Sequence, residues 1–291
     1  MRVLVHGGAG GEPREPAPRQ KTLDRAAQTG ADTDTPTDAV VDAVRVLESD
    51  PRFNAGVGSA VQSDGEIRTD AGLMTDDGTT GAVCSMHNVE HAVSVARAVA
   101  EETPHVMVAG EQAVALADAF DVPTGCDLWS ERARERWDEL EMVESESIQE
   151  QIAWVNERFG GSDTVGAVAT DGEHLASATS TGGRWCAIAG RVGDVPQVGA
   201  GFYTTERAAV STTGAGEAIA KFGLARRVAD AIDRGDNPEE ATSRLIDEFD
   251  EKTDASAGVI AVDGNGRTGE AFNSAAMQTA ETSNAAFERE R

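Results

Sequence analysis

The stretch Thr164-Val-Gly-Ala-Val-Ala-Thr170, followed by Asp171-Gly172 and by Leu175-Ala-Ser-Ala-Thr-Ser180, decides the architecture that we expect. Asp-Gly between two runs of small and β-branched residues is a strong hairpin signal, because this pair tolerates the backbone angles of a tight turn. The sequence therefore predicts two antiparallel strands here. A threonine stands at the entrance to the first one.

The rest of the second half predicts helices followed by a further hairpin. Helical periodicity covers Glu217–Ile232 and Glu239–Phe249, and a second hairpin pairs Val259–Val262 with Thr268–Phe272. The second half is therefore predicted to run strands, then helices, then strands.

The first half is predicted to mix α and β structure. Val3–Val5 is expected to be a short buried strand that leads into a glycine-rich loop, His6–Gly10. Thr35-Pro36 provides an N-cap and a first helical residue, and Asp50-Pro51 ends that helix. Three other segments predict hairpins or helices: hairpins within Phe53–Val83, and helices at Val89–Ala100 and Gln112–Phe120.

Residues 131–162 differ in composition from both halves. Glu131–Glu150 is crowded with charge, and Arg158–Asp163 is glycine-rich and polar. Such composition is typical of exposed, mobile segments. We interpret this stretch as a linker that ends just before Thr164.

The charge balance excludes one class of function. Lys plus Arg number 25 and Asp plus Glu number 51, which leaves a formal net charge of −26. Such a surface repels a phosphate backbone, and no basic stripe with aromatic residues offsets it, so we exclude nucleic acid as a partner.

The only lysines are Lys21, Lys221 and Lys252. Together with the acid excess this indicates adaptation to high salt, where exposed charges are screened.

The composition and the lack of long apolar segments predict a globular protein in the cytoplasm. With 40% hydrophobic residues over 291 positions it can bury a sizeable core. The longest uncharged stretches, such as Val195–Thr205, are too short for the roughly 20 residues that span a bilayer. The N-terminal residues lack the apolar region of a secretory signal. Cys84, Cys126 and Cys186 are too widely spaced for a disulfide framework or a zinc pattern.

Two motifs suggest chemistry that their context does not support. His87-Asn-Val-Glu-His91 matches a zinc-peptidase pattern, but it straddles the end of an expected strand, whereas that pattern requires a continuous helix. His6-Gly-Gly with Ser180 could form an esterase site. In that fold the catalytic histidine follows the nucleophile, and every histidine here precedes Ser180.

Threonines in the second half offer a more specific possibility. Thr164 lies behind the expected linker, Thr181 lies in Thr-Ser-Thr-Gly-Gly, and Thr213 lies in Thr-Thr-Gly-Ala-Gly-Glu. An N-terminal threonine carries its own general base, since an α-amine has a pKa of roughly 8. Thr164 could use this chemistry if the chain were cut between Asp163 and Thr164.

Seven segments carry a resemblance to a known family. They occur in the family's order: His6–Gly10, Phe53–Gly58, Thr164–Ala169, Thr179–Gly183, Gly190–Asp194, Thr213–Glu217 and Phe272–Ser274. The chain resembles the plant-type asparaginases and isoaspartyl peptidases, which are N-terminal-nucleophile (Ntn) hydrolases. The resemblance implies an α/β (α+β) fold, a four-layer αββα sandwich, formed by residues 1–291 as a single domain. It also implies an (αβ)₂ heterotetramer of processed chains.

The resemblance implies a role for each matching residue. Autoproteolysis between Asp163 and Thr164 would give an α chain, 1–163, and a β chain, 164–291, with Thr164 as nucleophile. Thr181 would bond to the nucleophile, and Asn54 would help to position it. Thr213 and Gly214 would bind the oxyanion of the substrate. Arg191 would bind the substrate α-carboxylate and Asp194 its α-ammonium, and Gly216 would belong to the same substrate-binding group.

The implied substrates are L-asparagine and β-aspartyl dipeptides, hydrolysed without an organic cofactor. The segment Leu47–Val57 also resembles a loop that holds sodium in some members, which would here use the carbonyls of Leu47, Glu48, Asp50, Phe53, Ala55 and Val57. Two alternatives stay open. Asp163 before the nucleophile resembles the related glycosylasparaginases, and an uncleaved chain would be a binding protein of the same fold.

Overall fold

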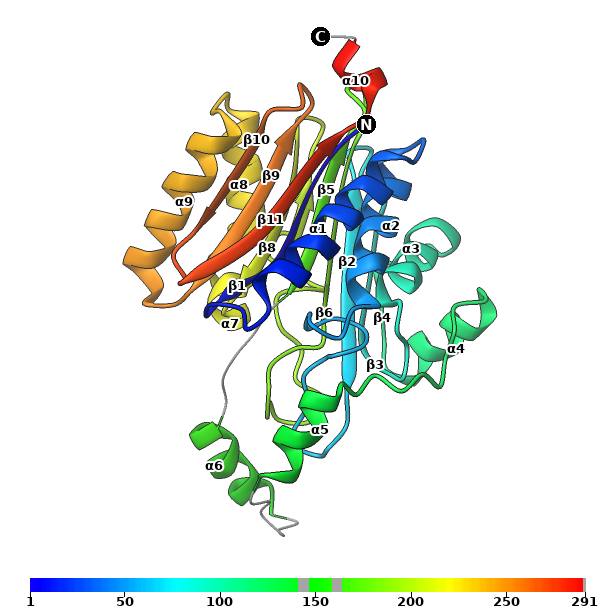
Figure 1. Cartoon of the computed structure of the whole chain (residues 1–291), viewed down its shortest axis with the longest axis vertical. Coiled ribbons are helices and arrows are strands. Elements are labelled where there is room, and N and C mark those ends of the chain that lie inside the picture. Colours follow the sequence, from blue (N-terminus) through cyan, green and yellow to red (C-terminus); the bar gives the residue numbers. More distant parts are fainter. Residues whose placement is uncertain (141–146, 159–163, 290–291) are drawn as a thin grey trace.

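A computed structural model describes residues 1–140, 147–158 and 164–289. Its largest element is a seven-stranded sheet, ordered β11-β1-β5-β6-β2-β3-β4 (Figure 1). All neighbours pair antiparallel except β3 and β4. The strands are β1 (Arg2–Gly10), β2 (Arg68–Thr75), β3 (Thr80–His87), β4 (Met107–Ala109), β5 (Val165–Thr170), β6 (Leu175–Thr181) and β11 (Ala276–Ser283).

A four-stranded antiparallel sheet packs face to face with the first. Its order is β10-β9-β8-β7, and its strands are β7 (Phe202–Thr204), β8 (Ala208–Gly214), β9 (Ala257–Asp263) and β10 (Thr268–Phe272). Apolar side chains from both sheets meet between them, among them Leu4, Val168 and Ile260. Polar pairs cross the same space, as where Ser177 Oγ lies 2.8 Å from Thr204 Oγ1.

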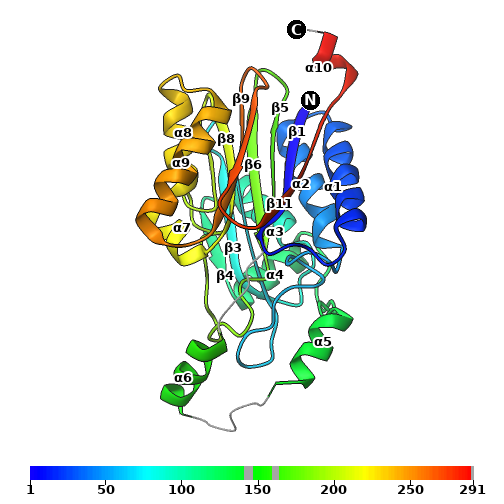
Figure 2. The ribbon, with the colours of Figure 1, turned by 60° about the vertical axis from the view of Figure 1, so that its left-hand side comes forward.

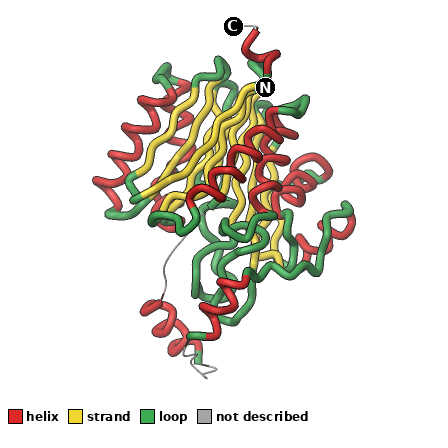
Figure 3. The backbone as a smooth tube through the Cα atoms, in the orientation of Figure 1, coloured by secondary structure: helices red, strands yellow, loops and turns green. Residues whose placement is uncertain are grey.

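Helices cover the outer face of each sheet. The large sheet is covered by α1 (Pro16–Ala31), α2 (Pro36–Glu48) and α3 (Ala92–Glu102), and the small one by α8 (Leu224–Asp233) and α9 (Pro238–Thr253) (Figures 1 and 3). Two apolar clusters lie between these helices and the sheets. The order helix, sheet, sheet, helix confirms the αββα sandwich, and Figure 2 shows the layers from the side. The remaining helices are α4 (Glu111–Ala119), α5 (Glu131–Asp138), α6 (Ile148–Arg158), α7 (Gly216–Phe222) and α10 (Ala285–Arg289).

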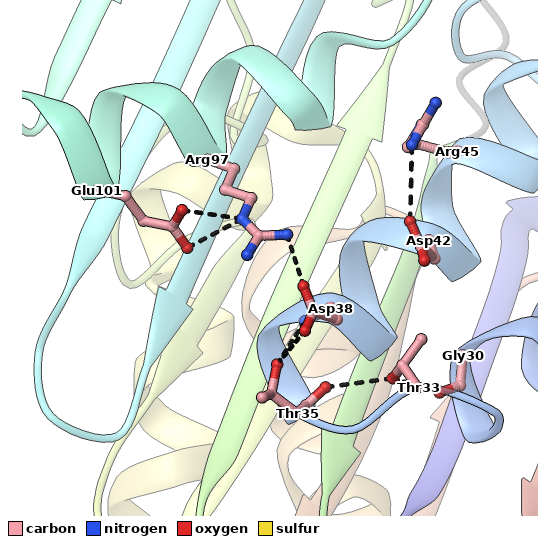
Figure 4. A network of polar contacts seen from close by, with 8 residues as sticks. All are labelled: Gly30, Thr33, Thr35, Asp38, Asp42, Arg45, Arg97 and Glu101. Carbon is pink, nitrogen blue, oxygen red and sulfur yellow. Dashed lines mark hydrogen bonds and ion pairs between the residues drawn. The ribbon is translucent and has the colours of Figure 1, made fainter.

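Several local predictions are confirmed. β5 and β6 form the hairpin predicted around Asp171-Gly172, and β9 pairs with β10 as expected. Thr35 caps α2, where its hydroxyl accepts the Asp38 N–H at 3.1 Å (Figure 4). Pro36 is the first helical residue. No described helix is long and apolar enough to cross a membrane.

The linker prediction for residues 131–162 is wrong where the structure describes them. Both α5 and α6 lie in this range, at the end of the molecule away from the chain termini (Figures 1 and 2). Trp154 and Val155 of α6 are buried in an apolar cluster that includes Trp185 of the second half. Tertiary burial therefore stabilises helices that the charged composition did not indicate.

Three other boundaries differ from prediction. His6–Gly10 is not a loop, because β1 continues to Gly10 with an irregularity between His6 and Ala9 where it pairs with β11. The expected helix Glu217–Ile232 is split by Gly223, which has a φ of 69°. The hairpins predicted within Phe53–Val83 are confirmed, as β2–β3 and as an isolated antiparallel bridge from Val61 to Ile67, but β3 continues to His87.

Candidate active site

Thr164 stands immediately before β5 with only 3% of its surface exposed. Its Oγ1 donates a long hydrogen bond to Thr181 Oγ1, 3.4 Å away. Thr181 ends β6, and antiparallel pairing of Val165 with Ser180 places it beside Thr164. Thr181 Oγ1 also accepts the N–H of Gly183 at 3.0 Å. The structure thus brings together two of the predicted catalytic residues, while Asp163 lies outside the described residues.

Thr213 and Gly214 end β8 at the same end of the sandwich. His6 Nε2 lies 2.8 Å from Ser211 Oγ, and the Ala9 N–H donates to Thr213 Oγ1 at 3.3 Å, so β8 runs alongside β1. Because β1 is antiparallel to β5, with His6 opposite Gly166, Thr213 lies toward the Thr164 end of β5. Gly214 has a φ of 132°, and a Cβ there would lie 2.4 Å from the Ser256 carbonyl oxygen. Only glycine therefore fits at this end of β8.

His6 is a buried polar residue next to Thr164 that the residue assignments above did not include. Burial lowers the pKa of His6 to about 3, against a smaller opposing effect of a hydrogen bond with the Thr164 backbone. Its ring packs over Gly166, where a Cβ would lie 2.5 Å from Nε2. The imidazole is therefore neutral at physiological pH and too weak a base to activate Thr164, so we assign it a structural role between the sheets.

Arg191 and Asp194 approach each other across Gly216. A Cβ on Gly216 would lie 2.5 Å from Asp194 Oδ1 and 2.9 Å from Arg191 Nη2, so glycine is required for both side chains to occupy this space. Asp194 is 4% exposed, and its Oδ2 has no hydrogen-bond partner among the described residues. A buried carboxylate oxygen without a donor is costly, which makes this atom ready to accept a cationic ligand.

Two buried carboxyl groups lie in the field of Arg191. Burial raises the pKa of Asp194 to about 6, although Arg191 opposes the shift. Burial also raises the pKa of Asp70 to about 7, with Ser85 N–H and Arg191 opposing it and Asp194 adding to it. Asp70 stands opposite Thr181 in the β2–β6 ladder and accepts the Ser85 N–H at 2.7 Å. Asp70 could not be found from the sequence, because only the strand register places it at the site.

Glu217 is a second residue that sequence reasoning did not single out as part of the site. Its Oε1 accepts the Arg191 Nε–H at 2.8 Å, and its Oε2 accepts from Arg184 Nη1 at 3.2 Å. Arg191 Nη2 lies 2.8 Å from the same Oε1 but makes no aligned hydrogen bond within the described chain. Glu217 therefore holds one edge of the guanidinium while Nη2 keeps donor capacity for a carboxylate.

Asn54 connects the first half of the chain to the strand end that carries Thr181. Its Nδ2 donates to the Gly183 carbonyl at 2.7 Å, its Oδ1 accepts the Ala60 N–H at 2.7 Å, and its carbonyl accepts the Gly182 N–H at 2.9 Å. These bonds fix the backbone that follows Thr181. Such a position is compatible with the predicted positioning role.

The segment 47–57 offers oxygen ligands for a small cation. It closes on itself where the Val57 N–H donates to the Glu48 carbonyl at 2.8 Å, and the Asp50 carbonyl accepts the Phe53 N–H at 3.0 Å. A carbonyl has two lone pairs, so these bonds leave ligand capacity. The two buried carboxylates of the segment already have partners: Asp50 is paired with Arg52 at 2.8 Å, and Glu48 Oε1 accepts the Val93 N–H at 3.1 Å. The loop therefore offers carbonyl oxygens, a donor type that suits a hard cation such as sodium.

The zinc pattern fails on geometry, as predicted. His87 ends β3 and His91 precedes α3, so the two imidazoles do not share a helical face. The described part of the chain contains no group of three or more His, Cys, Asp or Glu side chains placed to hold a metal.

Comparison with known proteins gives consistent matches. The family model described as asparaginase matches residues 1–289. An isoaspartyl peptidase/L-asparaginase from Danio rerio is 38% identical over 290 residues, covering 96% of this chain and 91% of that protein. A plant-type L-asparaginase from Pyrococcus furiosus is 38% identical over 297 residues, covering 96% and 95%. An isoaspartyl peptidase/L-asparaginase from Bos taurus is 38% identical over 287 residues, covering 94% and 91%.

Proposed function

The chain belongs to the asparaginase family, and we propose that it hydrolyses the side-chain amide of L-asparagine and the isopeptide bond of β-aspartyl dipeptides. This proposal rests on the placement of Arg191 and Asp194 around Gly216, with Asp194 Oδ2 lacking a hydrogen-bond partner among the described residues. A free aspartyl head group has one carboxylate and one ammonium on the same carbon. An arginine and a carboxylate on either side of a glycine match that pair of charges.

Thr164 is the proposed nucleophile, and it acts first on its own chain. Its Oγ attacks the Asp163 carbonyl carbon, the C–N bond breaks, and the peptide becomes an ester with a free Thr164 amine. Water then cleaves the ester to leave residues 1–163 and 164–291 as separate chains of one folded domain. The hydroxyl contact of Thr164 with Thr181 supports this assignment.

The freed amine is the proposed general base for substrate hydrolysis. It takes the Oγ proton as Oγ attacks the side-chain carbonyl carbon of the substrate. The Thr213 hydroxyl and the Gly214 N–H would stabilise the negative charge on the carbonyl oxygen. Ammonia, or the amine of the second residue, leaves with the proton. Water hydrolyses the resulting β-aspartyl ester and restores Thr164.

Sodium is proposed for the loop at 47–57, where it would hold the shape of the segment that carries Asn54. This loop also reaches β6, because Ser180 Oγ–H donates to Glu48 Oε1 at 2.6 Å. Replacement of Na⁺ by choline at constant ionic strength should lower Tm. An unchanged Tm would argue against the ion. We also propose an (αβ)₂ assembly and a cytoplasmic location, as the family resemblance implies.

The decisive experiment is intact-mass analysis combined with ammonia release from asparagine. Wild-type protein should give two fragments, one with Thr164 at its N-terminus, and should release ammonia. Thr164→Ala should remain one chain and be inactive. Thr170→Ala, at the other end of β5, is the matched control and should still be cut. An intact, inactive wild-type chain would refute the proposal and favour a binding protein. Faster cleavage of N-glycosylated asparagine than of β-aspartyl dipeptides would favour the glycosylasparaginase alternative.

A further inference from the structure

A pocket of about 200 Å³ opens between α5 and the loops that hold Asn54 and Trp185. Its walls include Gly10, Ser59 and the two α5 arginines Arg132 and Arg136. None of the described residues that line it is acidic. In a chain of net charge −26, a pocket lined by arginines without any carboxylate needs an explanation.

Arg132 and Arg136 are the two α5 arginines that have no ion pair among the described residues. Arg134 between them is paired with Asp127 at 2.5 Å. The two stand four residues apart on one face of α5, an arrangement in which like charges destabilise a helix. Arg52, which also lines the pocket, is by contrast held by Asp50 at 2.8 Å.

Two further features of the pocket favour an anionic ligand with an organic body. The Arg136 guanidinium lies 4.1 Å from the centre of the Trp185 ring, which holds it in place while leaving its N–H groups at the edge. Ser59 is fully buried, and its Oγ has no hydrogen-bond partner among the described residues. An unpartnered buried hydroxyl is a ready donor or acceptor for a bound molecule.

The pocket adjoins the proposed catalytic site on the side of the first half of the chain. Asn54 lines it and is bonded to Gly183, two residues beyond Thr181. Gly10 also lines it and follows Ala9, whose N–H donates to Thr213. Arg191 and Asp194 belong to the second half and do not line this pocket. A substrate whose aspartyl head group is bound by Arg191 and Asp194 can place its leaving residue, beyond the scissile bond, in this pocket.

We propose that Arg132 and Arg136 bind the terminal carboxylate of the leaving residue of a β-aspartyl dipeptide. This inference rests on the proposed function. Asparagine has no such group, because its leaving group is ammonia. The dipeptide has one carboxylate more, so the pocket would favour isoaspartyl dipeptides over asparagine and offset the repulsion that the acidic protein exerts on an anionic substrate.

The test compares kcat/KM for three substrates: β-aspartyl-alanine, its C-terminal amide, and asparagine. Wild-type enzyme should prefer the free acid over the amide by about tenfold, the order expected for hydrogen bonds to a charged group. In the Arg132→Ala/Arg136→Ala double variant that preference should disappear, and the ratio of dipeptide to asparagine kcat/KM should fall by about tenfold. Arg132→Lys/Arg136→Lys should retain part of the preference.

Arg134→Ala is the control on the same helix and should keep the wild-type preference, because Arg134 does not line the pocket. The Arg132→Glu/Arg136→Glu double variant should reverse the preference and make the amide the better substrate. Misfolding would lower both activities without such a reversal, so this variant separates the two causes. If wild type and the alanine double variant show the same acid-to-amide ratio, the inference is overturned while the proposed function stands. If wild type hydrolyses none of the three substrates, both are overturned.

Discussion

Thr181 Oγ1 lies 3.4 Å from Thr164 Oγ1 although the two residues are 17 positions apart in the chain. The β5–β6 hairpin creates this contact, and Gly183 N–H orients the Thr181 hydroxyl. A hydroxyl held by the backbone can keep the proposed nucleophile in one rotamer and relay its proton. In the proposed mechanism Thr181 would therefore act on the same group in chain cleavage and in hydrolysis.

Thr181→Ala should slow both reactions by about 100-fold, the scale of a lost proton-transfer partner. Thr181→Ser keeps the hydroxyl and should retain most of the activity. The measurements are the rate of fragment appearance by mass spectrometry and kcat for asparagine with cleaved protein. Equal rates for the alanine variant and wild type would show that the contact is structural only.

The pH dependence should reflect the Asp194 carboxyl group. Its pKa is raised to about 6, so at pH 5 only about a tenth of the free enzyme has the carboxylate that pairs with the substrate ammonium. We expect kcat/KM to fall about tenfold between pH 7 and pH 5 through this group. Asp194→Asn should lower kcat/KM by about 100-fold or more at pH 7 and remove this step. The Thr164 amine would still titrate in the variant, so the pH effects of the amine and of the Asp194 carboxyl can be separated.

Local signals allowed part of the fold to be predicted. The Asp171-Gly172 hairpin and the Thr35 cap depend on neighbouring residues alone, and both are confirmed. By contrast, α6 is stabilised by burial of Trp154 in a cluster that includes Trp185, which no local pattern reveals. The extension of β1 beyond His6 likewise depends on pairing with β11, a strand from the other end of the chain.

The residues of the candidate site also fall into some that the sequence predicts and some that it does not. Thr164, Thr181, Arg191 and Asp194 lie in motifs that could be recognised, and the structure places them within one region. Asp70 and Glu217 join them only through strand register and side-chain packing. Pairings between distant strands, rather than residue type, therefore determine which additional charges act on the substrate-binding groups.

The cap of α2 provides a test of stability away from the site. Thr35 accepts the Asp38 N–H and donates to Asp38 Oδ2 at 2.7 Å, and Asp38 also pairs with Arg97 (Figure 4). Thr35→Ala should lower the free energy of unfolding by about 1 kcal/mol. Thr37→Ala, two positions on, should have a smaller effect because no hydrogen bond of its side chain is described. Chemical denaturation measures both, and equal losses would contradict the capping role.

The net charge predicts that stability rises with salt. At −26 the folded chain repels itself, and screening shortens the range of this repulsion to about 3 Å at 1 M salt. Tm should increase between 0.1 and 2 M KCl by several degrees, a scale set by about 1 kcal/mol. KCl is used so that a sodium site does not contribute. A Tm that is constant or falls across this range would remove the argument for adaptation to high salt.

Asp70 should make the protein less stable as pH rises from about 4 to about 7. Burial raises its pKa to about 7 in the folded chain, whereas its ordinary value is 3.8. The folded state therefore holds a proton that the unfolded state releases, and stability falls as pH rises from about 4 to about 7. Asp70→Asn keeps an acceptor for the Ser85 N–H and removes the ionisation. The variant should be more stable than wild type at pH 8, and the difference should vanish near pH 4.

Asp38→Asn is the control of opposite sign, because hydrogen bonds from Thr35 and Arg97 outweigh burial and lower the pKa of Asp38. Asp38→Asn should be less stable than wild type at pH 8 and approach it in acid. Denaturant unfolding of the three proteins at both pH values measures these differences, and an Asp70→Asn gain that does not change with pH would show that Asp70 stays ionised throughout.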